Sequence, residues 1–491
     1  MLNEANKNKD NITVVRGGWV LALIENKPHI LKDHDVVIEG DHIQDIVPGR
    51  YKGHVDVEID ATSGIVMPGF INLHTHADAS LHGTTVDLYP PYGEGKGSSN
   101  IPIDLDTVFL YSIFFPLGNI LGGYIGNESE TEKLLSEEEK SALVRLALLG
   151  LVKGGSTTIV EMCSLGAEFF AEHALEVGAR AYIGKSYASI GVMPYYDYDT
   201  GRVVYDESNS TPFEGLERAI EFHKKYDGMA NGRIRTILAP HATDTCNPEL
   251  LRATRETADK LDSNITIHLA QAVPEMEHIR EKFNMTPVEY LDDVKLLGPD
   301  LIAAHGVYTN RRDRSLLRRT DTTIVHCTTS FAKGGIFLPL KHFIKEGINV
   351  GVGTDSFSVD YLTELRTGSL LSKVVEEDPY IGMAHDMVSY GTLNGAKALN
   401  RPDLGRISPG AKADLIVVNL SGLHNAPVLD PIRKAVYSSN QKDIETVIID
   451  GQVVIEDGHF KNIDEEKAIR DAKPGFDKIW SIAQEKGLFT L

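Results

Sequence analysis

The chain has 491 residues, of which 42% are hydrophobic, and a formal net charge of −21. This length suggests one large domain with a smaller one, and the acidic charge argues against nucleic acid or an anionic membrane as a partner. The three cysteines lie far apart, no apolar run approaches the roughly 20 residues of a membrane helix, and the first ten residues contain no signal-like apolar segment. We therefore expect a cytoplasmic protein.

Both ends of the sequence are rich in short strand patterns. In the N-terminal part, strands are expected at 12–15, 19–24, 35–38 and 55–59, separated by Gly, Asn, Pro and Asp. The C-terminal part repeats this style at 413–418 and at 446–455, where Asp450-Gly451 predicts a hairpin turn. We interpret residues 1–66 and 406–491 as two parts of one small β-sandwich domain, the second ending in a helix.

The middle of the chain, residues 67–405, alternates strands with helices. Helical patterns such as 137–152 and 274–283 intervene between strands. This alternation predicts a (β/α)8 barrel, in which the chemistry lies at the C-terminal ends of the strands. The eight expected strands are 65–73, 157–162, 181–185, 234–239, 265–269, 301–304, 323–325 and 348–352.

One long segment interrupts this alternation. Residues 86–136 follow the first barrel strand and are rich in Gly, Pro and Tyr. The segment is placed to fold over the mouth of the barrel. The alternative interpretation is a disordered surface insertion.

Two histidines, His74 and His76, stand at the end of the first barrel strand. Side chains two residues apart on a strand point to the same side, so both imidazoles are expected to converge on one point. Neutral imidazole is a preferred ligand of zinc, iron and nickel. Two histidines with this spacing are also common at the surface or in the core of a protein. The prediction of a metal site therefore depends on the residues at the ends of the other strands.

Those other strand ends are also rich in possible ligands. A single histidine at a strand end is usually a packed or hydrogen-bonded residue, but six of the eight strands end in His or Asp. Because all of these ends face one mouth of the barrel, the pattern indicates a common site. The residues in question, beyond the first pair, are His241, His268, His305, His326 and Asp355.

Coordination chemistry suggests a division of roles. His74, His76 and His268 supply nitrogen, and Asp355 supplies a carboxylate that can also accept a proton from water. A metal held by such a set can bring the pKa of a bound water to about 7, which gives a hydroxide nucleophile at neutral pH. His305 is then free to stabilise the attacked centre, and His241 is expected to contact substrate from the opposite rim.

With these residues the chain resembles the amidohydrolase superfamily, in particular the aminohydrolase branch of s-triazine chlorohydrolases and deaminases of purines and adenosine-like compounds. The resemblance covers nearly the whole chain. The segments that carry it are MPGFINLHTH (67–76), APHA (239–242), IHLA (267–270), TPVEYL (286–291), AAHGV (303–307), VGVGTDS (350–356), NGAKAL (394–399) and LGRISPGAKADL (404–415).

The resemblance implies one divalent metal ion, zinc or alternatively iron, with His305 beside the metal-bound water. The implied ligands are His74, His76, His268 and Asp355. Related enzymes with two metals carry a carbamylated lysine at the end of the fourth strand, where this chain has His241. Lys185, on the third strand, is interpreted as structural.

Two departures from the family pattern concern substrate. The family usually has Glu three residues after the histidine of the fifth strand, where it transfers a proton to a ring nitrogen; this chain has Gln271. An amide can hydrogen-bond, but it cannot gain and lose a proton near pH 7. The second departure is segment 327–331, where the family usually shows Pro and Asn. We therefore expect Gln271, Cys327 and Phe331 to border the substrate, with His241 opposite.

We expect a metal-dependent hydrolase that attacks a ring carbon of a small nitrogen heterocycle and releases ammonia or an amine. Because of Gln271, an alternative is the same first step with release of chloride or sulfide, or the opening of a cyclic amide. A third alternative is a catalytically silent binding scaffold on the same fold, although all expected ligands are present. The substrate would be the main partner, and we expect a homodimer or higher homo-oligomer.

Overall fold

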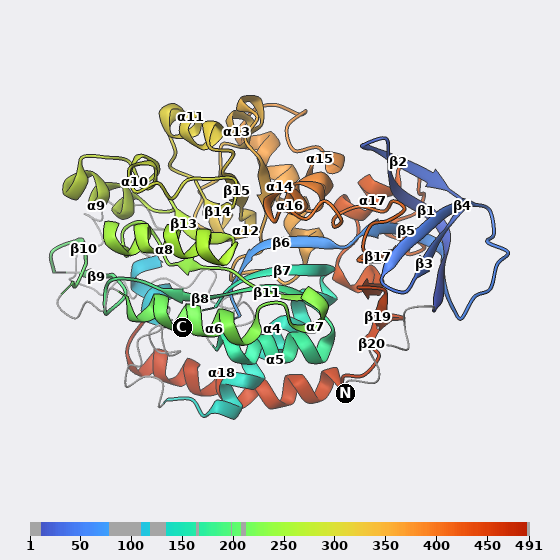
Figure 1. Cartoon of the computed structure of the whole chain (residues 1–491), viewed down its shortest axis with the longest axis horizontal. Coiled ribbons are helices and arrows are strands. Elements are labelled where there is room, and N and C mark those ends of the chain that lie inside the picture. Colours follow the sequence, from blue (N-terminus) through green and yellow to red (C-terminus); the bar gives the residue numbers. More distant parts are fainter. Residues whose placement is uncertain are drawn as a thin grey trace.

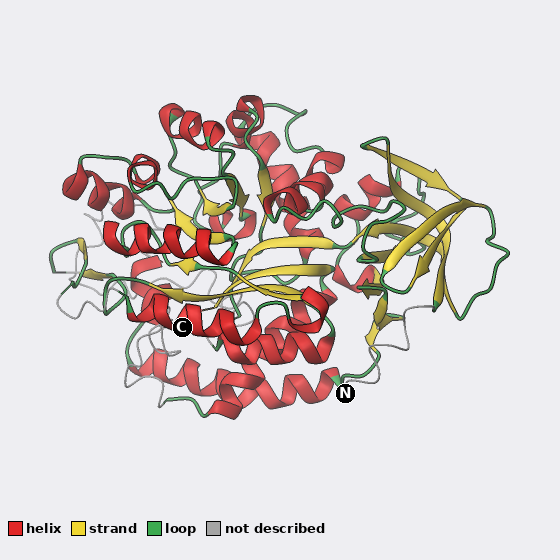
Figure 2. Ribbon diagram, viewed as in Figure 1, coloured by secondary structure: helices red, strands yellow, loops and turns green. Residues whose placement is uncertain are grey.

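The computed structural model describes residues 11–77, 110–117, 134–163, 166–197, 199–207 and 213–488. It is an α/β structure in which one mainly antiparallel sheet lies beside two parallel sheets surrounded by helices (Figures 1 and 2). Among the residues that it describes, every helix is too short or too polar to span a lipid bilayer.

Strands from both ends of the chain form one nine-stranded sheet, at the right of Figure 1. Strand β5 is central, because it pairs in parallel with β1 and antiparallel with β17. A separate apolar core, which includes Val20, Ile38, Leu415 and Ile448, packs within this sheet. The strands run in the order β20 (His459–Phe460), β19 (Gln452–Glu456), β18 (Ile444–Ile449), β17 (Leu415–Asn419), β5 (Val57–Pro68), β1 (Ile12–Ile24), β3 (His34–Glu39) and β4 (His42–Pro48), with β2 (Lys27–Lys32) beside β1.

The middle of the chain forms two parallel sheets. The first sheet has β11 (Ile234–Thr236), β8 (Arg180–Tyr187), β7 (Ser156–Cys163) and β6 (Phe70–Thr75) in that order, with β12 (Ala239–Pro240) also beside β8; the second has β13 (Ile265–Leu269), β14 (Leu301–His305), β15 (Thr323–His326) and β16 (Val350–Val352). Single β-bridges between Thr75 and Asp355 and between Leu238 and Ile265 link the two sheets. Several strands are buried along their whole length, as expected for parallel sheets with both faces covered.

The first predicted barrel strand, 65–73, is in fact divided between two sheets. Strand β5 ends at Pro68 and β6 begins at Phe70. A Cβ atom at Gly69 would lie 2.1 Å from Oγ1 of Thr157, so only glycine fits at the break. Proline at the end of a strand cannot donate a ladder hydrogen bond, which favours a break here. The apolar run 65–73 therefore contributes to a strand in the terminal sheet and to a strand in the first parallel sheet.

Helices lie outside the parallel sheets, mostly between successive strands (Figure 2). Helix α4 starts with a capping box of Ser136 and Glu139, and the C-terminal helix α18 packs against it. The helices are η2 (Leu110–Phe114), α4 (Glu137–Lys153), α5 (Ala167–Val177), α6 (Glu214–Tyr226), α7 (Met229–Gly232), α8 (Pro248–Leu261), α9 (Val273–Phe283), α10 (Pro287–Asp293), α11 (Arg311–Arg319), α12 (Thr328–Ala332), α13 (Leu340–Glu346), α14 (Tyr361–Val375), α15 (Ala384–Tyr390), α16 (Leu393–Ala398), α17 (Pro431–Tyr437), η4 (Gln441–Asp443) and α18 (Glu465–Glu485).

A buried arginine joins the first parallel sheet to the terminal sheet. Nε of Arg180, the first residue of β8, donates to Oδ2 of Asp414 at 2.7 Å, and its Nη2 donates to Oδ1 of Asp450 at 2.9 Å. The arginine side chain is 2% exposed. Removing one partner of such a buried ion pair typically costs about 3–5 kcal/mol, because the other charge is left uncompensated. These ion pairs of Arg180 with Asp414 and Asp450 therefore link the first parallel sheet to the terminal sheet.

Candidate active site

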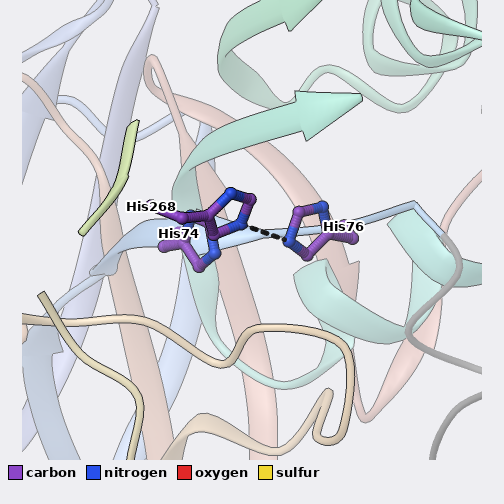
Figure 3. Close-up of side chains that lie close together, drawn as sticks. All are labelled: His74, His76 and His268. Carbon is purple, nitrogen blue, oxygen red and sulfur yellow. Dashed lines mark hydrogen bonds between the residues drawn. The ribbon is translucent and has the colours of Figure 1, made fainter. Parts of the chain in front are cut away.

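Three buried histidines converge at the C-terminal ends of β6 and β13. His74 lies on β6, His76 follows the end of that strand, and His268 lies on β13; the ligand atoms of the three side chains all lie within 4.8 Å of one another. Nε2 of His76 and Nε2 of His268 are 3.3 Å apart (Figure 3). The structure thus brings the three predicted side chains together.

Main-chain carbonyl groups hold two of these rings in one orientation. Nδ1 of His76 lies 2.9 Å from the oxygen of Met162, and Nδ1 of His268 lies 2.6 Å from the oxygen of His241. A carbonyl only accepts hydrogen bonds, so each Nδ1 donates its proton to the carbonyl, and each Nε2 points toward the other histidines. Because this is the arrangement of histidines that bind metals, both Nε2 atoms are prepared to be ligands.

His74 is the least satisfied side chain of the group. It is fully buried, and neither of its ring nitrogens has a hydrogen-bond partner among the described residues. Burial lowers the pKa of this imidazole well below its ordinary value, so the ring is neutral at pH 7. A buried polar atom without a partner is costly, and a metal ion would supply the missing one.

A carboxylate completes the group. Oδ1 of Asp355 lies 3.9 Å from Nε2 of His74 and 3.5 Å from Nε2 of His76. Oγ of Ser330 donates to Oδ2 of Asp355 at 2.6 Å, and the main-chain nitrogen of Ser356 donates to Oδ1 at 2.8 Å. Burial raises the pKa of Asp355, but the neighbouring imidazoles, led by His305, outweigh burial and lower it. The carboxylate is therefore ionised at pH 7.

His305 and Asp355 also have unusual backbone geometry. His305 has a φ of 83° and Asp355 a φ of 53°, both in the left-handed region that non-glycine residues rarely adopt. Such strained residues cluster at functional sites. Gly353 leaves room beside them, since a Cβ atom there would lie 2.8 Å from the main-chain oxygen of His74.

The donor set fits a divalent metal. Three imidazoles and one carboxylate are ligands that zinc and ferrous iron accept, and neither ring nitrogen of His74 has a hydrogen-bond partner among the described residues. His305 lies close by, in a second group with His74 and Asp355 whose ligand atoms are also within 4.8 Å of one another. Burial lowers the pKa of His305 to about 4, so this ring is neutral as well.

A small cavity of about 40 Å³ opens next to this group. Its wall includes the predicted residues His241, Gln271, His305 and Phe331. Burial lowers the pKa of His241 to about 3, and its Nδ1 lies 2.9 Å from Oγ1 of Thr245. The full lining is His76, Leu110, Phe114, Phe115, His241, His268, Gln271, His305, Ser330, Phe331, Lys333, Asp355 and Phe357.

The structure does not place Cys327 in this lining, contrary to our expectation. Its sulfur lies 4.0 Å from the main-chain oxygen of Val325, and the side chain is buried in an apolar cluster. The reason is local: Cys327 is followed directly by helix α12, which brings Ser330, Phe331 and Lys333 to the cavity in its place. Neither His326, whose ring packs against Phe337, nor Lys185, which is paired with Glu168, lines the cavity.

Several lining residues escaped the sequence reasoning. Leu110, Phe114 and Phe115 belong to the part of segment 86–136 that the structure describes, and they form an apolar wall of the cavity. The prediction that this segment covers the mouth is supported for residues 110–117; its other parts, 86–109 and 118–133, lie outside the described residues. The apolar run at 110–117 was the available signal. No sequence pattern around Lys333 or Phe357 indicates that these residues line the cavity.

Behind Gln271 lies a buried acid that the sequence reasoning also missed. Oε2 of Glu275 accepts a hydrogen bond from the main-chain nitrogen of Gln271 at 2.7 Å, and its Oε1 accepts one from Ala270 at 2.9 Å. Burial, reinforced by the nearby Asp244, raises the pKa of Glu275. Its position in the first turn of α9 gave the available signal.

Comparison with known proteins identifies the family. The model of the Amidohydrolase family matches residues 65–454. The chain belongs to this family. It is 33% identical over 463 residues to a 5-methylthioadenosine/S-adenosylhomocysteine deaminase of Pyrococcus abyssi, covering 93% of this chain and 96% of the relative. It is also 31% identical to a 5'-deoxyadenosine deaminase of Methanothermobacter thermautotrophicus, covering 88% of this chain and 91% of the relative.

Solved structures agree with this fold. An adenosine deaminase from Xanthomonas campestris with bound zinc superposes with a TM-score of 0.79 at 23% identity, covering 96% of this chain and 99% of the other. Atrazine chlorohydrolase from Arthrobacter aurescens, complexed with zinc, gives a TM-score of 0.80 at 20% identity, covering 94% and 100%. The amidohydrolase described here is a hydrolase that acts on carbon–nitrogen bonds.

Proposed function

We propose that this amidohydrolase deaminates an adenosine-type nucleoside, with release of ammonia from the purine ring. The observation that carries the proposal is the convergence of three buried imidazoles and one ionised carboxylate at an aromatic-lined cavity. The deaminase names of the relatives, which cover most of this chain, support it.

We propose that His74, His76, His268 and Asp355 hold one zinc ion, with iron as the alternative. When bound, such an ion lowers the pKa of a water molecule to about 7. Asp355 then accepts a proton from the attacking water, and the hydrogen bonds from Ser330 and Ser356 keep its carboxylate in place. A neutral His305 hydrogen-bonds to the group that develops negative charge during attack.

The remaining lining residues would hold the heterocycle. Phe114, Phe115, Phe331 and Phe357 offer flat apolar surfaces on which a planar ring can stack. His241 contacts substrate from the rim opposite His305. Gln271 donates or accepts a hydrogen bond at the ring, but it cannot supply the proton that a ring nitrogen takes up during attack.

The amide of Gln271 favours a second candidate function. A substrate that is already protonated on the ring, or that carries an exocyclic C=O or C=S group, needs no proton from this position. Such an enzyme would expel chloride or sulfide, or would open a cyclic amide, by the same first step. This candidate uses the same ligands and differs only in the leaving group.

We also propose two finer features of the fold. The single bridges between the two parallel sheets support the predicted closed (β/α)8 barrel, since eight strand positions then follow one another around a ring. The separate core of the nine-stranded sheet supports the predicted β-sandwich domain built from residues 1–66 and 406–491.

We propose a homo-oligomer in solution. Apolar side chains at Leu370, Val374 and Val375 on helix α14 and at Tyr380 just beyond it are 49–76% exposed. Exposed apolar patches on soluble proteins often mark protein interfaces. Light scattering after gel filtration tests this: Val374→Glu should lower the measured mass if the patch is the interface.

Product analysis tests the function. Zinc-loaded protein is incubated with adenosine, 5'-deoxyadenosine, 5'-methylthioadenosine and S-adenosylhomocysteine, and in parallel with chlorinated s-triazines and thiocarbonyl heterocycles. Ammonia, chloride and sulfide are then measured. Ammonia release from a nucleoside supports the proposal; release of chloride or sulfide alone favours the second candidate. The Asp355→Ala protein is the control for contaminating activity.

A further inference from the structure

Asp244 is a buried acid to which the proposed mechanism gives no role. It lies three residues after His241, in the segment that follows β12, and it is not part of the cavity wall. Its side chain is buried, and its Oδ2 accepts a hydrogen bond from the hydroxyl of Tyr205 at 2.9 Å and a longer one from the hydroxyl of Tyr111 at 3.4 Å. Burial raises the pKa of both tyrosines well above the ordinary value, so each hydroxyl keeps its proton and acts as the donor.

The two tyrosines belong to segments that lie outside the two parallel sheets. Tyr111 is in η2, and Phe114 of the same helix lines the cavity. Tyr205 follows β10 (Arg202–Val204), which pairs with β9 (Tyr195–Asp197), and β9 in turn packs beside η2. One carboxyl oxygen therefore joins two separate segments to the chain that leaves β12.

The segment after β10 is also attached to helix α9. The ring of Tyr205 stacks on the ring of His278, with the two ring centres 3.9 Å apart. Glu207 forms an ion pair with Lys282, further along the same helix. These contacts limit how far the hydroxyl of Tyr205 can move away from Asp244.

Ring contacts connect Tyr111 to the cavity. Its ring meets the ring of Phe115 edge to face, with centres 5.2 Å apart, and the ring of Phe115 meets that of His241 at 5.8 Å. Phe115 and His241 both line the cavity. His241, Asp244, Tyr111 and Phe115 therefore form a closed circuit of covalent and packing contacts behind one side of the cavity.

The segment that carries Asp244 is itself held on both sides. Oγ1 of Thr243 donates to Oε1 of Glu275. The hydroxyl of Tyr290 donates to the main-chain oxygen of Cys246 at 2.9 Å. Side chains that are fixed by packing and by further hydrogen bonds hold their neighbours most precisely. Asp244 is thus suited to be an anchor for the segments that contact it.

We propose that Asp244 is a positioning residue, which holds the apolar wall formed by Leu110, Phe114 and Phe115 through Tyr111 and Tyr205, and thereby determines how tightly a planar heterocycle is bound. The wall contacts the ring of the substrate and does not belong to the groups of potential metal ligands. Loss of the anchor should therefore weaken substrate binding more than it slows the chemical step. This inference rests on the proposed function for the place of the substrate, and it deepens that function by assigning the residue that holds the binding wall.

Steady-state ammonia release from 5'-methylthioadenosine by the zinc-loaded protein tests the inference. Asp244→Asn should raise KM about tenfold, the usual size of a buried hydrogen bond, and should change kcat and metal content less than about twofold. Tyr111→Phe and Tyr205→Phe remove one donor each and should raise KM by smaller factors. In the Asp244→Asn background, the effect of Tyr111→Phe should be largely lost, because both changes act on one contact.

Amide hydrogen exchange distinguishes positioning from a general loss of stability. Asp244→Asn should speed exchange in residues 110–117 and 199–207 and leave exchange in β13 as in the wild-type protein. Tyr437→Phe is the matched control, because it removes a tyrosine hydroxyl that lies 2.8 Å from Oγ of Ser369 and does not line the cavity. This control should show the wild-type KM and the wild-type exchange in both segments.

An unchanged KM in Asp244→Asn, or exchange that rises as much in β13 as in residues 110–117, would overturn the inference. So would a kcat that falls by the same factor as KM rises. Failure of the proposed function is distinguishable, because the wild-type protein would then release no ammonia from the nucleoside. KM is in that case compared on the chlorinated s-triazine or thiocarbonyl heterocycle that the protein turns over, and the exchange measurement applies unchanged.

Discussion

Nδ1 of His268 lies 2.6 Å from the main-chain oxygen of His241, so one hydrogen bond connects a proposed metal ligand to a residue at the rim of the cavity. The strand that carries His268 is thereby held in register with the segment that carries His241; a single bridge between Ala242 and His268 adds to this. The imidazole is fixed before any metal arrives. A preorganised site of this kind binds metal with little reorganisation.

The first prediction concerns metal content and stability. Purified protein should contain about one zinc or iron ion per chain by elemental analysis, and a chelator should lower its melting temperature, because a ligand present at 1,000 times its Kd adds about 4 kcal/mol. His268→Ala should lose the metal and most of this chelator effect. Two ions per chain, or a metal content unchanged in His268→Ala, would contradict the assignment.

The second prediction distinguishes the role of Asp355 from that of Ser330, which donates a hydrogen bond to its carboxylate. Asp355→Ala should reduce turnover to background and weaken metal retention, because it removes both a ligand and the proton acceptor. Ser330→Ala removes only the hydrogen bond to Oδ2 and should cost about tenfold in kcat. The two rates, together with metal content, are measured side by side. Full activity of Asp355→Ala would remove this residue from the mechanism.

The third prediction distinguishes the two rim histidines. His305→Ala should lower kcat by about 100-fold, the usual contribution of one group that stabilises a transition state. His241→Ala should act mainly on KM. Steady-state kinetics at matched metal content gives both constants, and a variant with less than one ion per chain is excluded from the comparison. Equal effects of both changes on kcat would show that the proposed division of roles is incorrect.

The fourth prediction tests the replacement of the usual acid. Gln271→Glu should leave metal content intact, since this side chain lines the cavity without belonging to either group of potential ligands. If the natural substrate needs no proton from this position, the change should impair the native reaction and create weak deamination of s-triazines or purines. A wild-type protein that already deaminates purines at ordinary rates would mean that another residue transfers the proton.

The fifth prediction concerns pH and the buried Glu275. Its pKa is raised in the folded protein, so the folded state holds this proton to a higher pH than the unfolded state does. The resulting contribution to stability is present below the ordinary pKa of about 4.3 and is lost as pH rises through the raised value. Glu275→Gln should therefore lose less stability than wild type between pH 5 and about 9, measured by urea denaturation. If stability falls equally with pH in the two proteins, the pKa of Glu275 is not raised in the folded state.

The sequence predicts the parallel strands well because each is a short apolar run with a polar residue at its end. The predicted strand 265–269 coincides with β13, and 446–455 forms the expected hairpin of β18 and β19. Residues 12–15 and 19–24 instead join into the single strand β1. The break at Gly69 was missed, because an apolar pattern does not reveal that Thr157 leaves no room for a side chain there.

The proposed ligands and four residues of the cavity wall were predictable, but the apolar part of the wall from segment 110–117 and the position of Cys327 were not. His74, His76, His268 and Asp355 follow strands, and parallel strands bring their C-terminal ends together. Phe114, by contrast, reaches the cavity from a long segment whose path no local pattern fixes. Cys327 was misplaced because α12 turns the chain within a few residues. Lys333 is an ordinary surface residue in sequence, and only the packing against Phe357 gives it a place in the cavity.

The pairing of Arg180 with Asp414 and Asp450 has a practical consequence for anyone who wishes to shorten or recombine this enzyme. The predicted barrel, residues 67–405, ends before Asp414, yet a fragment that stops there would retain the buried guanidinium of Arg180 without its two carboxylate partners. Exchanging the C-terminal part with that of a relative therefore succeeds only if the relative also has carboxylates at the positions of Asp414 and Asp450. The last strands of the chain are therefore part of the minimum catalytic unit, although none of their described residues lines the cavity.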